Sequence, residues 1–129
     1  MSESPYILRE MTVVFSQDVI AFCRSEPSTT ITRPLIDQLL RSATSIGANY
    51  AEVDNAASRM DFRNKIFIAK KEAAEAKYWL GLLLDVTSSP DLCKKLLTDC
   101  HYLLMTLQKV VNTLGNRSQI TGHRKLTGN

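Results

Sequence analysis

Apolar residues recur at steps of three and four along most of the chain, which predicts four amphipathic helices. They span about residues 7–24, 33–57, 59–86 and 90–114. Alternating runs of Val, Ile and Thr, typical of strands, are almost absent. Because the connections are short, successive helices are expected to be antiparallel. The sequence therefore predicts an all-α, up-down-up-down four-helix bundle.

Residues that favour helix ends stand at the predicted boundaries. Thr32 and Ser58 are suitable N-caps, Pro90 suits a first turn, and Gly115 is a natural stop. We find no internal repeat, so residues 1–115 are expected to form one domain. Residues 116–129 contain few large apolar groups and are expected to form a mobile tail.

The third predicted helix carries apolar residues outside its core stripe. On a helical wheel they lie well away from that stripe, and one is the only Trp of the chain. A second apolar face favours burial between subunits, although the same residues could simply widen the core stripe. The predicted oligomer interface consists of Ile68, Trp79, Leu82 and Val86.

Basic residues also align on this helix. Arg59, Arg63, Lys70 and Lys77 fall within about 40° of one another on the wheel. Such a row can follow a phosphate backbone, but a solvated helix flank is the commoner explanation. The tail adds Arg117, Arg124 and Lys125 and no acid, so it accounts for the net charge of +3. These seven residues are the candidate nucleic-acid contacts.

A polar row accompanies the apolar stripe of the second helix. It consists of Arg41, Ser45, Asn49 and Glu52. An Arg and a carboxylate in such a row can fix helix packing through hydrogen bonds, or they can line a binding groove. The packing role is favoured, because catalysis usually needs a His, a Cys or a carboxylate pair with a shifted pKa.

Catalytic and metal-binding patterns are not evident in the sequence. Cys93, Cys100 and His101 lack zinc-ligand spacing, and the odd count of three cysteines suits reduced thiols. No phosphate-binding loop, nucleophile elbow or HExxH pattern occurs. We therefore expect no enzymatic activity, no metal and no cofactor. No apolar run is long enough for a membrane span and no signal peptide precedes the first helix, so a cytoplasmic location is expected.

The segments RSATSIGANYAE (41–52) and DFRNKIFIAKKEAAEAKYWL (61–80) resemble the bacterial family named after 23S rRNA intervening sequences. Arg41, Ser45, Ile46, Asn49, Ala51 and Glu52 carry the resemblance, with the Ala-rich stretch from Ala69 to Ala73. Val53 follows the Ala51-Glu52 pair, at a position where this family often has Gly. The resemblance implies a left-handed four-helix bundle and a homopentamer. Related accessory proteins of diversity-generating retroelements form basic pentamers that bind nucleic acid and reverse transcriptase, and no catalytic residues carry over.

Two functions follow from these features. The first is a homo-oligomeric adaptor that binds RNA, DNA or a ribonucleoprotein, indicated by the basic row, the basic tail and the resemblance. The alternative is a protein-interaction scaffold with no nucleic-acid role, in which the face around Trp79 holds another protein. An enzyme with an unfamiliar site ranks below both, because no pair of titratable groups is fixed in a recognisable geometry.

Overall fold

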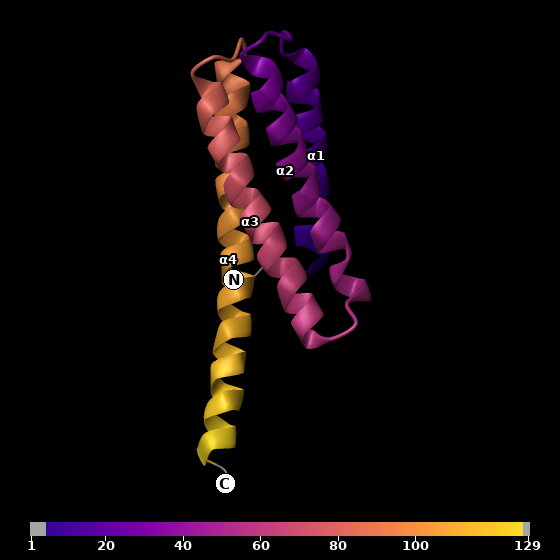
Figure 1. Ribbon diagram of the computed structural model, residues 1–129, viewed down its shortest axis with the longest axis vertical. Coiled ribbons are helices and arrows are strands. Elements are labelled where there is room, and N and C mark those ends of the chain that lie inside the picture. Colours follow the sequence, from indigo (N-terminus) through magenta and orange to yellow (C-terminus); the bar gives the residue numbers. More distant parts are fainter. Residues whose placement is uncertain (1–4, 128–129) are drawn as a thin grey trace.

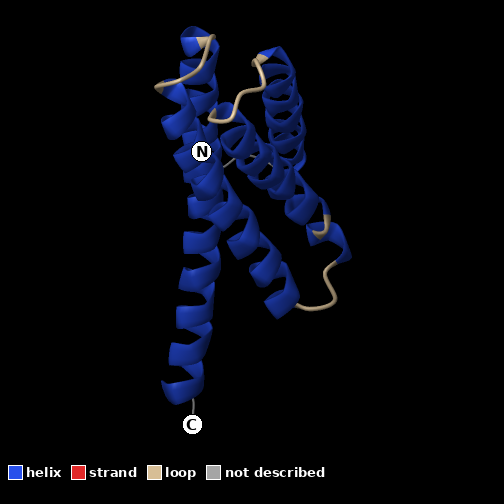
Figure 2. Ribbon diagram, turned by 45° about the horizontal axis from the view of Figure 1, so that its top comes forward, coloured by secondary structure: helices blue, strands red, loops and turns tan. Residues whose placement is uncertain are grey.

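The protein is an all-α bundle of four helices (Figure 1). The computed structural model describes residues 5–127, with side chains for residues 7–53 and 55–115. The helices are α1 (Pro5–Ser25), α2 (Thr32–Ala51), α3 (Arg59–Leu84) and α4 (Pro90–Thr127), with a 3₁₀ turn η1 (Val53–Asn55) between α2 and α3. Figure 2 shows helices and loops only, and residues 5–127 contain no strand. The predicted fold class is confirmed.

Neighbouring helices pack in a ring in which α2 lies against α1 and α3, and α4 lies against α3 and α1. Side-chain contacts show that neighbours are antiparallel. Across α2 and α3, Arg41 contacts Glu75 while the later Glu52 contacts the earlier Lys65. Across α3 and α4, Lys77 contacts His101 while the earlier Arg63 contacts the later Leu114. The α1/α4 seam is the most loosely packed of the four.

The core consists of the predicted apolar stripes. Half of the buried residues of α3 are alanines, and the others are Ile66, Leu80 and Leu83. α1 and α4 bury mainly larger side chains. Burying a side chain the size of Leu or Phe contributes about 1.5–3 kcal/mol each. The fully buried residues include Val19, Phe22, Leu39, Ile46, Ile66, Ala73, Leu80, Leu96, Cys100 and Leu107. A Cβ built at Gly47 would lie 3.5 Å from Thr12, an ordinary van der Waals contact, so the packing of α1 on α2 does not require a glycine there.

The start of α3 is capped as its sequence predicts. Ser58 Oγ accepts a hydrogen bond from the Asp61 amide at 3.0 Å, and Asp61 Oδ2 accepts one from the Ala57 amide at 3.0 Å. These two bonds form a variant of the capping box in which the carboxylate reaches one residue further back. The cap fixes where the corner between α2 and α3 ends.

Both ends of α2 differ from the prediction. Thr32 is already helical, and Thr29 supplies the cap: its hydroxyl accepts from the Thr32 amide at 3.0 Å, and Thr32 Oγ1 accepts from the Thr29 amide at 3.0 Å. At the other end, the α-helix stops at Ala51 rather than at residue 57. The chain tightens into η1 there, and extended backbone at Ala56 turns it towards α3.

The predicted stop of α4 at Gly115 is wrong, since the helix continues to Thr127. A glycine ends a helix by adopting a left-handed conformation, and Gly115 does not have a positive φ. The backbone of residues 116–127 is therefore helical rather than an irregular tail, and Figures 1 and 2 show it extending past the other three helices.

The two loops at the opposite end of the bundle are tied together. The Glu26 carboxylate accepts hydrogen bonds from the Thr87 hydroxyl and, at 3.4 Å, from the Ser88 amide. This contact joins the α1–α2 loop to the α3–α4 loop, so both ends of α3 are anchored.

Candidate interaction surfaces

The basic row of α3 lies on the flank that faces α4. Lys77 Nζ is 2.9 Å from His101 Nδ1, and Arg63 donates to the Leu114 carbonyl at 3.4 Å. Lys70 lies on the same flank between these two contacts, seven residues or about two turns before Lys77. The structure thus brings the predicted row together along the α3/α4 seam, with Arg59 exposed at its end.

The acidic residues of α3 lie on the other flank, towards α2. Arg41 of α2 donates to Glu72 at 3.3 Å and to Glu75 at 3.1 Å. Burial, followed by the charge of Glu75, raises the pKa of Glu72, and the Arg41 charge opposes that rise. The charges of α3 are therefore partly segregated. Glu72 and Glu75 pair with α2 and the basic row lies on the α4 side, while Lys65 pairs with Glu52 on the α2 side.

The polar row of α2 does not converge on one site. Arg41 and Glu52 each reach across to α3, where Glu52 pairs with Lys65. Asn49 instead donates to the Ser45 carbonyl within its own helix at 2.8 Å. These contacts fit the predicted packing role better than a shared binding groove.

The C-terminal part of α4 and its extension are basic in sequence. Residues 100–129 contain no Asp or Glu, and Lys109 lies within this stretch. The predicted contacts Arg117, Arg124 and Lys125 belong to its helical extension, and their side chains lie outside those that the structure describes.

The predicted apolar face of α3 is partly open in the protomer. Ile68, Leu82 and Val86 are 40%, 39% and 44% exposed. Trp79 is half-buried against the core, and its ring packs edge-on against Tyr78. Trp79 therefore also supports its own protomer, which agrees with the alternative that it widens the core stripe of α3.

Three further apolar residues on the outer face of α3 were missed. Met60, Phe67 and Tyr78 are 71%, 45% and 60% exposed. Their seven- and eleven-residue spacing is helical and is visible in the sequence, on a face of the wheel next to the series that begins at Ile68.

Beside Tyr78 there is a hollow of about 510 Å³ between α2 and α3. Tyr78 and Trp79 form an aromatic wall, and the polar residues that line the hollow are Gln38, Arg41, Lys71 and Glu75. It thus combines aromatic rings with two cations and one carboxylate, which Arg41 engages.

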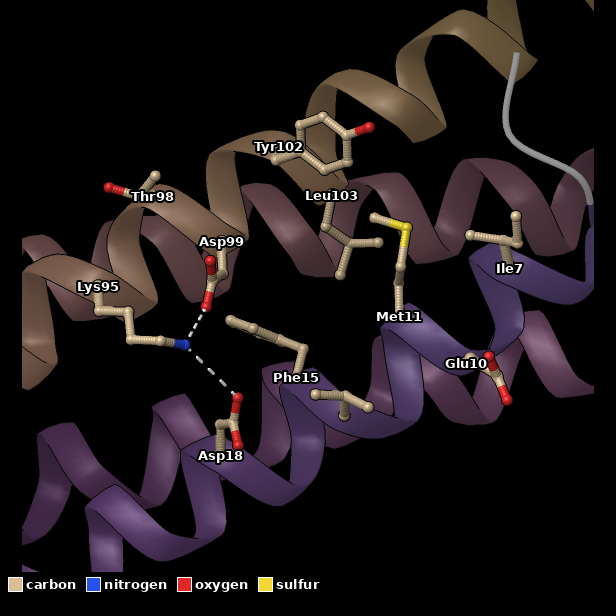
Figure 3. A pocket seen from close by; sticks show the side chains of 11 residues that line it. Ile7, Glu10, Met11, Phe15, Asp18, Lys95, Thr98, Asp99, Tyr102 and Leu103 are labelled. Atoms are coloured by element: carbon tan, nitrogen blue, oxygen red, sulfur yellow. Dashed lines mark hydrogen bonds and ion pairs between the residues drawn. The ribbon is translucent and has the colours of Figure 1, made fainter. Parts of the chain in front are cut away.

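A larger groove of about 630 Å³ follows the α1/α4 seam (Figure 3). Met11, Phe15 and Leu103 line its apolar part. At one end Lys95 lies 2.8 Å from Asp99 and 3.9 Å from Asp18. Sequence periodicity does not reveal this groove, because it gives the faces of the helices but not the spacing between them.

The three thiols do not form a reactive or metal-binding site. Burial raises the pKa of Cys100 to about 12 and, with the charge of Glu26, raises the pKa of Cys23 and Cys93 to about 11. Cys93 and Cys100 donate to the α3 carbonyls of Leu80 and Ala73. Among the described residues, no cluster of three metal-ligating side chains occurs. Within the same part of the chain, every helix is too short or too polar to cross a bilayer.

Comparison with known proteins gives two matches. Residues 7–109 match the family described as 23S rRNA-intervening sequence protein. A crystal structure from Bacteroides thetaiotaomicron, of a protein of unknown function from the S23 ribosomal protein family, is 28% identical, with a TM-score of 0.70. That similarity covers 84% of this chain and 97% of the other. No curated protein matches significantly.

Proposed function

Because the chain belongs to the 23S rRNA-intervening sequence protein family, we propose that it is a non-enzymatic, homo-oligomeric adaptor that binds RNA, DNA or a ribonucleoprotein. The charge segregation of α3 is the observation that carries this proposal. Pairing with Arg41 holds Glu72 and Glu75 on the α2 side, so they do not neutralise Lys70 and Lys77 on the other flank.

The basic surface would contact the phosphate backbone. Lys70 follows Arg59 by eleven residues and Lys77 follows Lys70 by seven, which correspond to advances of about 16.5 Å and about 10.5 Å along the helix axis. α4 adds Lys109 and, in the sequence of its extension, Arg117, Arg124 and Lys125. Phosphate contacts of this kind release counterions, so affinity falls as salt rises.

Self-association would multiply this surface. The partly open apolar residues Ile68, Leu82 and Val86 support an interface with other copies, and the family resemblance implies five subunits. In a ring, the α3/α4 seams of successive subunits would form a continuous basic belt.

Direct binding tests the proposal. The purified protein is mixed with labelled structured RNA and with duplex DNA at about 50 mM salt, where phosphate contacts are strong. We expect a retarded complex in a mobility-shift assay. The absence of any complex with either probe would refute the nucleic-acid role.

The second candidate is a scaffold that binds another protein through the open apolar face of α3. The exposure of Ile68, Leu82 and Val86 favours it as well. Light scattering separates the candidates, because a monomer that binds no nucleic acid fits the scaffold alone.

A further inference from the structure

The outer face of α3 carries exposed aromatic rings in a line. Phe67 and Tyr78 are 45% and 60% exposed. They are eleven residues apart, which places them about 20° apart on the wheel and about 16 Å apart along the axis. Both rings are thus available on one side of one helix.

Cations are interleaved with these rings. Lys71 lies on the same face between Phe67 and Tyr78, while Lys70 and Lys77 lie on the adjoining flank. The neighbouring acid, Glu75, is engaged by Arg41 on the α2 side. Asp85, the C-cap of α3, ends this surface.

Tyr78 also forms a wall of the α2/α3 hollow. Its ring centroid is 5.0 Å from that of Trp79, at an interplanar angle of 73°, so Trp79 supports it edge-on. Gln38 also lines the hollow of about 510 Å³. Its Oε1 accepts from Arg41 Nε at 3.4 Å, and its amide NH₂ group supplies a donor for a base edge. A planar ring of a ligand that stacked on the Tyr78 side chain would lie close to Lys71 and Gln38, which line the same hollow.

We infer that this face binds unpaired nucleotides: bases stack on Phe67 and Tyr78, and the phosphates lie along Lys70, Lys71 and Lys77. This inference rests on the proposed function and narrows its ligand to single-stranded segments. Aromatic side chains among cations are the usual platform for single strands, because every base has a π-face. A duplex hides those faces within its own stack.

Charge disfavours a two-fold contact between two copies through this face. In a two-fold contact the same surface would meet itself, which would bring Lys70, Lys71 and Lys77 against their own counterparts. Like charges opposed in this way disfavour association.

The test compares two probes of similar charge: a short oligothymidylate and an abasic oligonucleotide of the same length. The wild-type protein should bind the thymidylate more tightly, and its binding should quench the emission of Trp79, the only tryptophan. Tyr78→Leu and Phe67→Leu should each weaken thymidylate binding about tenfold and leave abasic binding unchanged. Tyr78→Trp should retain the preference, because it keeps an aromatic face.

Tyr102→Leu is the matched control, since Tyr102 is 53% exposed in the α1/α4 groove. It should bind both probes as the wild type does. Equal binding of both probes by the wild-type protein, or failure to bind either probe, would overturn the stacking site. The proposed function would stand or fall separately, on the structured RNA and duplex DNA of the mobility-shift assay. A fall in oligomer mass in Tyr78→Leu, with the base preference unchanged, would assign this face to self-association instead.

Discussion

Arg41 Nη2 lies 3.1 Å from Glu75 Oε2, across the α2/α3 seam. The other end of the same guanidinium contacts Glu72, one turn earlier on α3, at 3.3 Å. Arg41 thereby holds both carboxylates on one side of α3. Glu72 and Glu75 are consequently not beside Lys70 and Lys77, which lie on the opposite side of α3.

Arg41→Ala should give a stability defect that grows with pH. The pKa of Glu72 is already raised, so the folded state keeps its proton above the ordinary Glu pKa of about 4.3, and stability falls as pH rises through that interval. Loss of the Arg41 charge raises the pKa of Glu72 further. The pH range between the ordinary Glu pKa and the pKa of Glu72 in the folded state then becomes wider, and more stability is lost across it. Urea unfolding at about pH 4 and pH 7 should show a larger deficit at pH 7; an equal deficit at both would contradict this linkage.

Leu103→Ala should destabilise the bundle by about 2–5 kcal/mol, because Leu103 is 1% exposed and its removal leaves a cavity. Urea denaturation measures this loss. Leu92→Ala is the matched control on the same helix, where the side chain is 37% exposed. We expect a loss below about 1 kcal/mol for the control, and equal losses would mean that Leu103 is not a core residue.

Gly115→Ala should stabilise α4, because a helical glycine is about 1 kcal/mol less favourable than Ala. A Cβ at this position meets nothing within 4 Å. Hydrogen exchange of the amides around residue 115 should slow. Gly81→Ala, at an equally open helical position, should give a similar gain in α3. Faster exchange in Gly115→Ala would indicate a left-handed cap and a helix that ends there.

Leu82→Glu should reduce the oligomer mass without changing helical content. Leu82 is 39% exposed and belongs to the proposed subunit interface, where a buried charge is unfavourable. It is a cleaner probe than Trp79→Ala, since Trp79 also packs against its own core. Val13→Glu, at a position 49% exposed on α1, is the control. Light scattering that shows the same mass for wild type and Leu82→Glu would remove this residue from the interface.

Periodicity predicted the four helices and most of their buried faces, because a repeat of 3.6 residues marks a core stripe directly. The stripe from Cys93 to Leu107 is buried as expected. The end of α4 could not be predicted in the same way, since Gly115 allows both a cap and a continued helix.

The surfaces were harder to predict than the core. The wheel placed Lys70 and Lys77 on one flank, but it could not show that α4 lies beside them or that Arg41 holds Glu72 and Glu75 away. The α1/α4 groove depends on how closely two helices approach, which depends on the side chains of both.

The salt dependence of RNA binding by the wild-type protein and by the Lys70→Gln, Lys77→Gln double variant tests the central claim most directly. Each lost phosphate contact lowers the slope of log affinity against log salt by about 0.7–0.9, so the double variant should lose about 1.4–1.8. Lys95→Gln, on the α1/α4 seam, should leave the slope unchanged. Identical slopes for the wild type and the double variant would show that the basic side of α3 does not contact phosphates.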